Sequence, residues 1–515
     1  MILVALISTL VLGGLLAMLL EKWVTGSAKW VGLVASLLTM SLAGSLWIQY
    51  TGIDASTVSN GVFMVFKKPW IPEFGIEFHL EVDGLGLVMV MLTGFLGLVA
   101  VLISWSQVKH KEGFYYLNLL WTLAGIMGVF LAFDLFLFYL FWEVMLVPMY
   151  FLISIWGSAN RIYAAYKFFI YTQIGGLLML VALLGLYFLN GSSTGVYSFN
   201  YWDLIKTVLT TEQSMWLMWG FLIAFLIKLP VLPLHNWLPD AHGEAPTAGS
   251  VILAGLLLKT GAYGILRFVV PFFPDASQSI AMPAMILGVC GILYGAKLAF
   301  AQTDMKRLVA YTSVSHMGFV IIGIFAFNQL AWQGVIMQLV AHGLSTGALF
   351  VLAGILYQRT GTRDIRKYGG LWATVPRMGV AGLILVLASL GLPGLANFVA
   401  EFMTLAGTFT TTPIIAIAAA IGLIAAAVYS LRIMQKVFYG QDTASEKISD
   451  LSSMETLTIA TVVFLLIYLG LNPGPITRTV EPSIKQLISQ VETPDKGGFS
   501  YRTQVNNKSS SNGKH

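Results

Sequence analysis

The chain has 515 residues, of which 57% are hydrophobic and only 10% are charged, against roughly 25% charged in soluble domains. Its single cysteine, Cys290, excludes an intrachain disulfide and any metal site built from paired cysteines, and a net charge of +5 gives no support for nucleic-acid binding. This composition is typical of a protein that crosses a membrane many times.

Apolar windows of about 20 residues, the length that spans a bilayer as a helix, recur along the whole chain. The first lacks a basic leader and a small-residue cleavage site, so we expect it to be retained as a membrane span. The windows predict an all-α polytopic membrane protein with about fourteen transmembrane helices. They lie at 2–20, 29–48, 84–105, 114–132, 134–155, 164–190, 214–237, 247–270, 278–300, 306–325, 330–357, 378–410, 413–436 and 456–472.

The segments between these windows differ in character. Residues 51–83 contain IEFHLEVD, whose alternation at period two predicts a small β-hairpin, and residues 196–213 predict a short surface helix. The Ser-, Asn- and Lys-rich tail from Pro494 predicts disorder. We divide the chain into an N-terminal three-helix segment with an outer loop (1–113), two five-helix units (114–270 and 271–437), a last helix with an outer segment (438–493) and the tail (494–515).

Basic residues are distributed unevenly between the two sets of loops. Counted from the first connection, alternate loops carry fourteen lysines and arginines, whereas the loops of the other set carry only Lys67, Lys68 and Lys206. Loops rich in Lys and Arg stay on the cytoplasmic side of a membrane. The bias predicts that both chain termini lie on the outer side.

Two of the windows contain helix breaks. Pro230 and Pro233 follow Lys228 in the first, and LGLPGLA interrupts the second within Ala388–Phe402. Each break precedes a helix that ends in a similar phrase, YGILR and VYSLR. Pro and Gly also merely kink membrane helices, but breaks at matching positions of two halves indicate an inverted-repeat transporter. Helices four to eight would then match helices nine to thirteen, and the odd number of helices inverts the second copy.

Six titratable residues fall in the middle portions of the predicted helices, and most lie within about three residues, or roughly 5 Å, of a helix midpoint. They are Glu143, Lys228, Lys259, His316, His342 and Glu401. A charge inside a membrane costs at least about 2.5–3.5 kcal/mol, so these groups require partners and water. Each can gain or lose a proton, whereas arginine, which cannot, is absent from the middle of the spans. A row of such groups at one depth predicts a proton relay in the membrane plane.

Structural roles are the alternatives for the same residues. Glu143 and Lys228 would also form a plain ion pair, and Lys259 would pack among small residues. The two histidines would only hydrogen-bond neighbouring helices. His235, in the first break, is an additional relay candidate. Arg267 and Arg432 lie near helix ends, where long side chains reach the membrane surface.

Four stretches of the chain carry a family resemblance: FWEVMLVPMYFLI, IKLPVLPLHNWLPDAHGEAPTAGSVILAGLLLKTGAYG, DMKRLVAYTSVSHMG and VAEF. They resemble the antiporter-like subunits of respiratory complex I, and the similarity covers most of Met1–Leu471. Within the family the chain is most similar to the bacterial M subunits, the counterparts of mitochondrial subunit 4. Glu401 stands where the L and N subunits and the cation-antiporter homologues are expected to carry lysine. The L subunits also continue into a long lateral helix, whereas here we expect one helix and a tail after Arg432.

The resemblance implies a function for the six residues. Each repeat would form a half-channel, Glu143 would pair with Lys228, Lys259 would be the central relay lysine, and Glu401 would lie at the exit side beyond the two histidines. It further implies a proton-translocating subunit of NADH:quinone oxidoreductase in a bacterial inner membrane.

The same resemblance assigns the redox chemistry to other chains. NADH, FMN, iron–sulfur clusters and quinone would belong to partner subunits, with no cofactor in this chain, and neighbouring antiporter-like subunits would be its main partners. The alternatives are a Na⁺/H⁺ antiporter complex, a related hydrogenase or plastoquinone-reducing complex, and a cytochrome with haem on His316 and His342.

Overall fold

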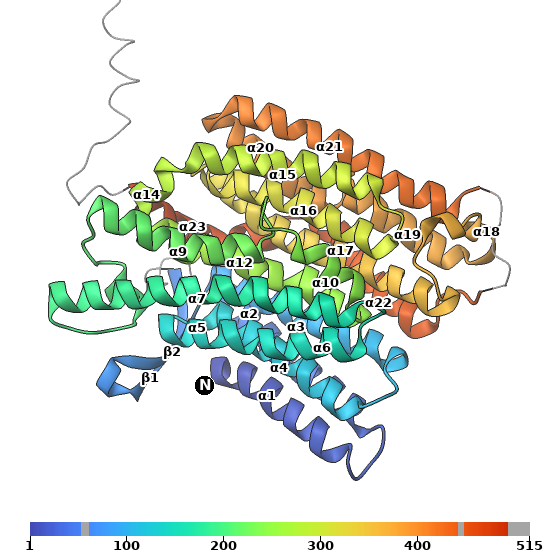
Figure 1. Ribbon diagram of the computed structural model, residues 1–515, viewed down its shortest axis with the longest axis horizontal. Coiled ribbons are helices and arrows are strands. Elements are labelled where there is room, and N and C mark those ends of the chain that lie inside the picture. The colour runs from blue at the N-terminus through green and yellow to red at the C-terminus, as the bar shows by residue number, and fades with distance from the viewer. Residues whose placement is uncertain (53–60, 441–447, 493–515) are drawn as a thin grey trace, which may run out of the picture.

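The structure is a computed structural model that describes residues 1–52, 61–440 and 448–492, and it consists mainly of long helices packed side by side (Figure 1). Within these residues, twelve helices are long and apolar enough to cross a membrane. The expected all-α polytopic class is therefore confirmed. The twelve are α1 (Ile2–Leu20), α2 (Ser27–Thr51), α3 (Gly84–Gln107), α4 (Glu112–Leu131), α5 with α6 (Leu135–Val144 and Leu146–Trp156), α7 (Arg161–Thr194), the continuous α11 to α13 (Thr247–Phe272), α15 (Ala281–Ala301), α16 (Met305–Ile324), α17 (Gln329–Thr360), α21 with η7 (Pro413–Phe438) and α22 (Ser453–Leu471).

The two remaining apolar windows are broken at the positions that the sequence predicts. In the first, α9 (Thr211–Lys228) ends at the lysine, and the chain turns through both prolines before α10 (Trp237–Glu244). In the second, α19 (Pro376–Ser389) and α20 (Ala396–Thr411) are separated by a turn in which Gly391 and Gly394 have φ angles of +78° and +95°. The count of fourteen membrane crossings stays a prediction.

The predicted β-hairpin is confirmed. Strands β1 (Val62–Ile71) and β2 (Ile76–Asp83) pair antiparallel, and the short η3 (Pro72–Phe74) joins them. The hairpin lies at one end of the bundle together with α8 (Tyr201–Leu204) and α14 (Pro274–Ser279), and we call this end the hairpin side (Figure 1). The opposite end carries the loops rich in Lys and Arg, with η6 (Ile365–Lys367) and α18 (Leu371–Thr374), and we call it the basic side.

Two expectations for the connecting segments are wrong. Residues 196–213 do not form one surface helix, because α8 has only four residues, its Tyr201 and Leu204 are buried, and residues 211–213 already belong to α9. After α22 the chain forms a further helix, α23 (Gly474–Glu492), so two helices rather than the expected one follow Arg432 in the described residues. Its apolar stripe of Ile476, Val480 and Ile484 packs against α3 and α17, although the helix as a whole is polar. The tail predicted to be disordered lies outside the described residues.

The helices differ in how deeply they are buried, and the most buried ones carry two of the predicted site residues. The segment Thr247–Phe272 and α17 are buried along their most apolar stretches, whereas α1, α2, α7, α15, α21 and α22 expose apolar side chains on one face. Exposed apolar faces are suited to lipid, because lipid tails are as apolar as these side chains. The two central helices carry Lys259 and His342, so these two residues lie in the interior of the protein.

Candidate functional site

Lys259 and His342 are in direct contact at the centre of the bundle. The Nζ atom of Lys259 lies 2.7 Å from His342 Nδ1 and 2.5 Å from the carbonyl oxygen of Ala254, and both side chains are buried. The π-helical turn η4 (Leu253–Leu257) widens the helix just before the lysine. A Cβ atom on Gly343 of α17 would lie only 3.1 Å from the carbonyl oxygen of Gly255 in that turn, so the glycine lets the two helices approach closely. Local helix distortion and small residues together bring the lysine to the histidine.

His316 links His342 to Glu401. Its Nδ1 atom is 3.0 Å from Glu401 Oε1, its Nε2 atom is 3.3 Å from the Tyr429 hydroxyl, and its ring centroid is 5.5 Å from that of His342. The four helices α12 (Leu258–Gly264), α17, α16 and α20 thus contribute Lys259, His342, His316 and Glu401 to one buried cluster. The structure brings together four of the six residues that the sequence placed at one depth.

Glu143 and Lys228 are neighbours but not an ion pair. Lys228 ends α9, and its amino group is buried between the rings of Trp142 and Phe168, 5.3 and 5.4 Å from their centroids. Glu143 is within electrostatic reach of this amino group, yet no contact under 4 Å between them occurs in the described part of the chain. The plain ion pair that was the structural alternative is therefore not formed in this conformation.

Gly261 lies between Lys228 and the central cluster of Lys259, His342, His316 and Glu401. A Cβ atom on Gly261 would lie 2.6 Å from the carbonyl oxygen of Phe225 and 3.1 Å from the Cβ atom of Lys228. No larger residue fits without a shift of the backbone. The glycine therefore allows the helix that carries Lys259 to pack against the end of α9, two residues away from the central lysine.

His235 lies apart from the row. Its ring is buried and meets the edge of Tyr294 on α15, with a centroid distance of 5.7 Å. Both ring nitrogens lack a hydrogen-bond partner among the described residues. In the described chain, none of the six residues forms a hydrogen bond, ion pair or ring contact with it.

Sequence reasoning missed His242, which the structure puts beside the cluster. The residue is buried on α10, stacks on Phe350 with a centroid distance of 4.9 Å, and has no hydrogen-bond partner for either ring nitrogen in the described chain. It lies within electrostatic reach of Lys306, Lys259 and His342. Its position just after the proline break is a signal in the sequence, but the residue falls between two apolar windows.

Gln338 is a second residue that the sequence did not single out. Ala331 of α17 packs against Gly407 of α20, and Ser345 of α17 accepts a hydrogen bond from Asn397 of α20 at 3.1 Å, so the two helices run antiparallel. Gln338 lies between these contacts, at the level of Glu401 and one turn from His342. It is buried, and neither amide atom finds a partner among the residues described. Buried polar atoms of this kind bind ordered water in proteins.

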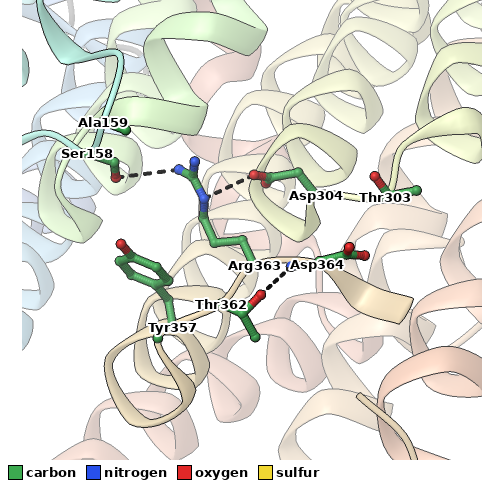
Figure 2. Close-up of a pocket in the computed structure, with 9 residues that line it drawn as sticks. Ser158, Ala159, Thr303, Asp304, Tyr357, Thr362, Arg363 and Asp364 are labelled. Carbon is green, nitrogen blue, oxygen red and sulfur yellow. Dashed lines mark hydrogen bonds and ion pairs between the residues drawn. The ribbon is translucent and has the colours of Figure 1, made fainter. Parts of the chain in front are cut away.

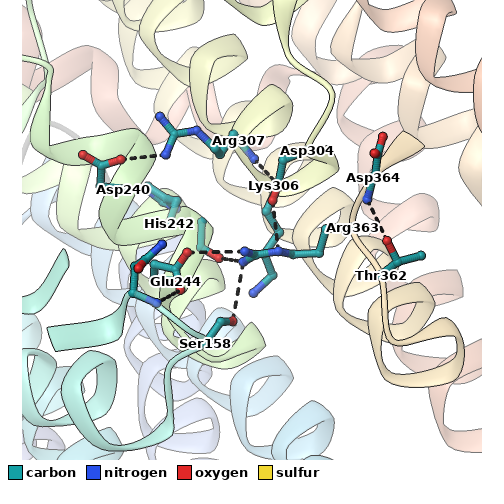
Figure 3. A network of polar contacts seen from close by, with 12 residues as sticks. Ser158, Asp240, His242, Glu244, Asp304, Lys306, Arg307, Thr362, Arg363 and Asp364 are labelled. Carbon is teal, nitrogen blue, oxygen red and sulfur yellow. Dashed lines mark hydrogen bonds and ion pairs between the residues drawn. The ribbon is translucent and has the colours of Figure 1, made fainter. Parts of the chain in front are cut away.

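On the basic side, ion pairs fasten the broken helix to its neighbours (Figure 3). Asp240 of α10 accepts from Lys167 and from Arg307, each at 2.6 Å. Arg363 reaches Glu244 at 3.3 Å and Asp304 at 3.0 Å, and it also donates to the carbonyl oxygen of Gly243.

A cavity of about 350 Å³ opens beside Arg363 and is lined by Ser158, Asp304 and Tyr357, among others (Figure 2). Water therefore has a space close to the end of the broken helix.

One expectation about arginine is wrong. Arg267 does not reach a membrane surface, because its guanidinium is buried and forms an ion pair of 2.5 Å with Asp83 at the start of α3. The partner lies 184 residues away in the chain, and sequence spacing alone gives no sign of it.

No group of three or more His, Cys, Asp or Glu side chains that could hold a metal ion occurs among residues 1–52, 61–440 and 448–492.

The fold and the buried titratable cluster define a multi-pass membrane protein of the antiporter-like class. The family described as "NADH:quinone oxidoreductase/Mrp antiporter, TM" matches residues 132–427. The chain belongs to this family, and the resemblance inferred from its motifs is confirmed.

Its similarity to named relatives is more specific. It is 50% identical over 484 residues to "NADH-quinone oxidoreductase subunit M" of Escherichia coli, which is 92% of this chain and 95% of the relative. It is 51% identical over 475 residues to the subunit of the same name from Pseudomonas aeruginosa, with coverage of 90% and 93%. A chain of respiratory complex I from Thermus thermophilus superimposes with a TM-score of 0.86 at 32% identity, covering 96% of this chain and all of that one.

Proposed function

We propose that the chain is the M-type proton-translocating subunit of a proton-pumping NADH:quinone oxidoreductase, in which quinone reduction elsewhere drives protons along the buried row. The observation that carries this proposal is the contiguous cluster of Lys259, His342, His316 and Glu401. Each member titrates, each is buried, and each comes from a different helix. The similarity to subunit M over most of the chain supports the assignment to this enzyme.

The contacts suggest the order of proton transfer. When Lys259 carries a proton, the 2.7 Å contact requires His342 Nδ1 to be the acceptor, so the histidine holds its own hydrogen on Nε2. Transfer across this contact leaves a neutral lysine and a charged His342. The next step, to His316, needs a bridging water or a ring rotation, because the ring centroids are 5.5 Å apart. His316 then donates to the carboxylate of Glu401 across 3.0 Å.

The Glu143 and Lys228 pair is the proposed control point of the relay. An ionised Glu143 favours a proton on Lys228, and protonating Glu143 or moving it away removes that preference. The helix that carries Lys259 packs directly against the end of α9 that carries Lys228, at Gly261. The two prolines leave backbone carbonyls free around Lys228, which favours water there. His242 and Gln338 would hold further water along the row.

The domain organisation and orientation are part of the proposal. Residues 114–270 and 271–437 would form two inverted repeats, and the broken helices and the π-turns η5 (Ile265–Val269) and η7 (Met434–Phe438) at matching phrases support it. The basic side would face the cytoplasm of a bacterial cell, with both termini outside the inner membrane. Neighbouring antiporter-like subunits would flank the chain, and partner subunits would bind NADH, FMN, iron–sulfur clusters and quinone.

A Na⁺/H⁺ antiporter complex is the main alternative, since the family description includes such proteins. The test is to purify the complex through a tag on this chain and to reconstitute it in proteoliposomes with an internal pH dye. We expect NADH and quinone to drive proton movement that needs no sodium and stops when quinone reduction is inhibited. Sodium-dependent proton exchange without copurified flavin and iron–sulfur subunits would favour the antiporter instead.

A further inference from the structure

Polar groups continue from Lys259 toward the hairpin side on the same helix. Tyr263 and Arg267 follow the lysine at intervals of four residues, so they lie on one face, roughly 6 and 12 Å farther along the axis. The Tyr263 hydroxyl donates to the carbonyl oxygen of Phe130 at 3.2 Å, and the guanidinium of Arg267 lies 5.4 Å from the Tyr263 ring. All three side chains are buried.

Arg267 is held from the hairpin side. Its Nη2 atom lies 2.5 Å from Asp83 Oδ2, and the Phe133 ring covers the guanidinium at 5.0 Å. Asp83 caps α3 by accepting from the backbone nitrogen of Gly86 at 2.8 Å, which fixes the carboxylate in place. Only 4% of the arginine and 1% of the aspartate are exposed. The guanidinium is therefore fixed between the helix that carries Lys259 and the end of the hairpin.

Titratable groups also run from the surface down to this pair. Strand β2 alternates, so Glu77, His79, Glu81 and Asp83 share one face. His79 Nε2 lies 2.6 Å from Glu81 Oε1, and the amide nitrogen of Asn200 bridges His79 Nδ1 and Glu77 Oε2 at 3.1 and 2.9 Å.

The outer end of this line meets water through Lys67. This half-exposed lysine pairs with Glu77 at 2.9 Å. Burial alone would raise the pKa of Glu77, but hydrogen bonds from Lys67 and Asn200 outweigh it and lower the pKa below its usual value. One face of the hairpin thus carries ionisable groups from the half-exposed Lys67 to the buried Asp83, with direct or Asn200-bridged contacts as far as Glu81.

Such ionisable groups would allow a passive proton leak, because protons that return from the hairpin side to Lys259 dissipate the transmembrane proton gradient. Between Lys259 and the hairpin, Arg267 is the group on this face that cannot release its proton at accessible pH. A fixed positive charge beside the path repels protons, as arginine does in channels that exclude them. At about 6 Å and an effective dielectric constant of about 20, one unpaired charge changes the occupancy of a neighbouring proton site by roughly 100-fold. The Asp83 carboxylate beside the guanidinium makes the effect of Arg267 smaller than this upper bound.

We propose that Arg267, fixed by Asp83, is an electrostatic seal that keeps protons on the hairpin side from reaching Lys259. The inference rests on the proposed relay role of Lys259 but adds a separate property, which is low passive proton conductance. It also gives a reason for a buried arginine near a row that otherwise contains none.

The test measures passive proton flux in proteoliposomes that hold the whole complex without substrate. A potassium gradient with valinomycin sets the potential, and an internal dye reports pH. We expect Arg267→Met, which keeps the length and apolar packing of the side chain, to raise the flux roughly tenfold or more. Arg267→Lys should stay close to wild type, because the charge is retained. Arg359→Met, which breaks the ion pair of 2.6 Å with Glu455 on the basic side, is the matched control and should not leak.

Asp83→Asn separates a seal from a structural clamp. It breaks the same ion pair but leaves the arginine charged, so a seal predicts little leak. A leak as large as that of Arg267→Met would show that the pair only holds the hairpin, and wild-type flux in an assembled Arg267→Met complex would also refute the seal. Should that variant fail to assemble, Arg267→Gln, which still donates to Asp83, is expected to show the same leak and is judged by the same criteria.

A double variant distinguishes failure of the seal from failure of the relay. Adding Lys259→Met to Arg267→Met should remove the leak if protons enter through Lys259. A leak that persists in the double variant would uphold the seal and refute Lys259 as the site it protects.

Discussion

The contact between His316 and Glu401 gives the sharpest test of the relay. At 3.0 Å between Nδ1 and Oε1, the bare Coulomb attraction between an ionised Glu401 and a proton on His316 is about 5.5 kcal/mol at an effective dielectric constant of 20, before the cost of burying the charges is subtracted. Glu401→Gln removes this charge while keeping the size of the side chain. A proton that arrives on His316 then has no anionic acceptor beside it, so the transfer step toward position 401 should slow. We expect proton pumping at roughly a tenth of wild type or less.

Glu401→Lys separates transport from scaffolding. Lysine still carries a proton, and the related subunits that this chain resembles are expected to use it here, so this variant should pump better than Glu401→Gln. A purely structural role predicts the opposite order, because Gln is nearly isosteric and Lys inverts a buried charge. The assay is NADH-driven proton uptake and quinone reduction at matched assembly levels. Wild-type pumping by the Gln variant together with an inactive Lys variant would show that the relay ends before Glu401.

The other positions give predictions of the same kind. Lys259→Arg should keep the charge but pump poorly, because arginine does not release its proton. Assembly is measured in parallel, because the larger side chain costs about 1–3 kcal/mol in a packed site. If the charge only stabilises packing, Lys259→Arg will pump nearly as well as wild type and Lys259→Met will be damaging. Glu143→Ala should lose most pumping in an assembled complex and Glu143→Asp should keep part of it, so full NADH-driven pumping by the alanine variant would contradict its control of Lys228. Gln338→Leu should slow pumping several-fold and change its solvent deuterium isotope effect by removing a site for bound water, whereas Gln333→Leu on the same helix should change neither; equal effects of the two would point to packing.

The elements that the sequence predicted well are those set by local chemistry. Prolines and glycines break α9 and separate α19 from α20 because they remove a backbone donor or favour positive φ angles, and neither effect depends on distant residues. Charged residues within apolar windows were also visible, because their cost in a membrane does not depend on the partner. Helix α23 was not predicted from the sequence, because its apolar residues form a stripe on a polar helix and leave no continuous apolar window.

The contacts between the predicted residues depend on tertiary packing and could not be predicted from spacing. Lys259 reaches His342 because a π-turn and a pair of facing glycines bring two helices together, 83 residues apart in the chain. His242 and Gln338 were missed for a related reason. A neutral amide, or a histidine after a helix break, becomes informative only when the fold buries it without a partner.

Lysine and arginine differ in their placement relative to the proposed relay. Where the proposed relay must pass a proton, the buried cations are Lys228 and Lys259, and both can become neutral. Where a fixed charge is useful, the cation is arginine: Arg267 pairs with Asp83 on the hairpin side, and Arg363 joins Glu244 to Asp304 on the basic side. Replacing Lys259 by arginine keeps the charge but stops proton release, whereas replacing Arg267 by lysine keeps the charge that repels protons. The first exchange is therefore expected to lower proton pumping, and the second is expected to leave passive proton flux close to wild type.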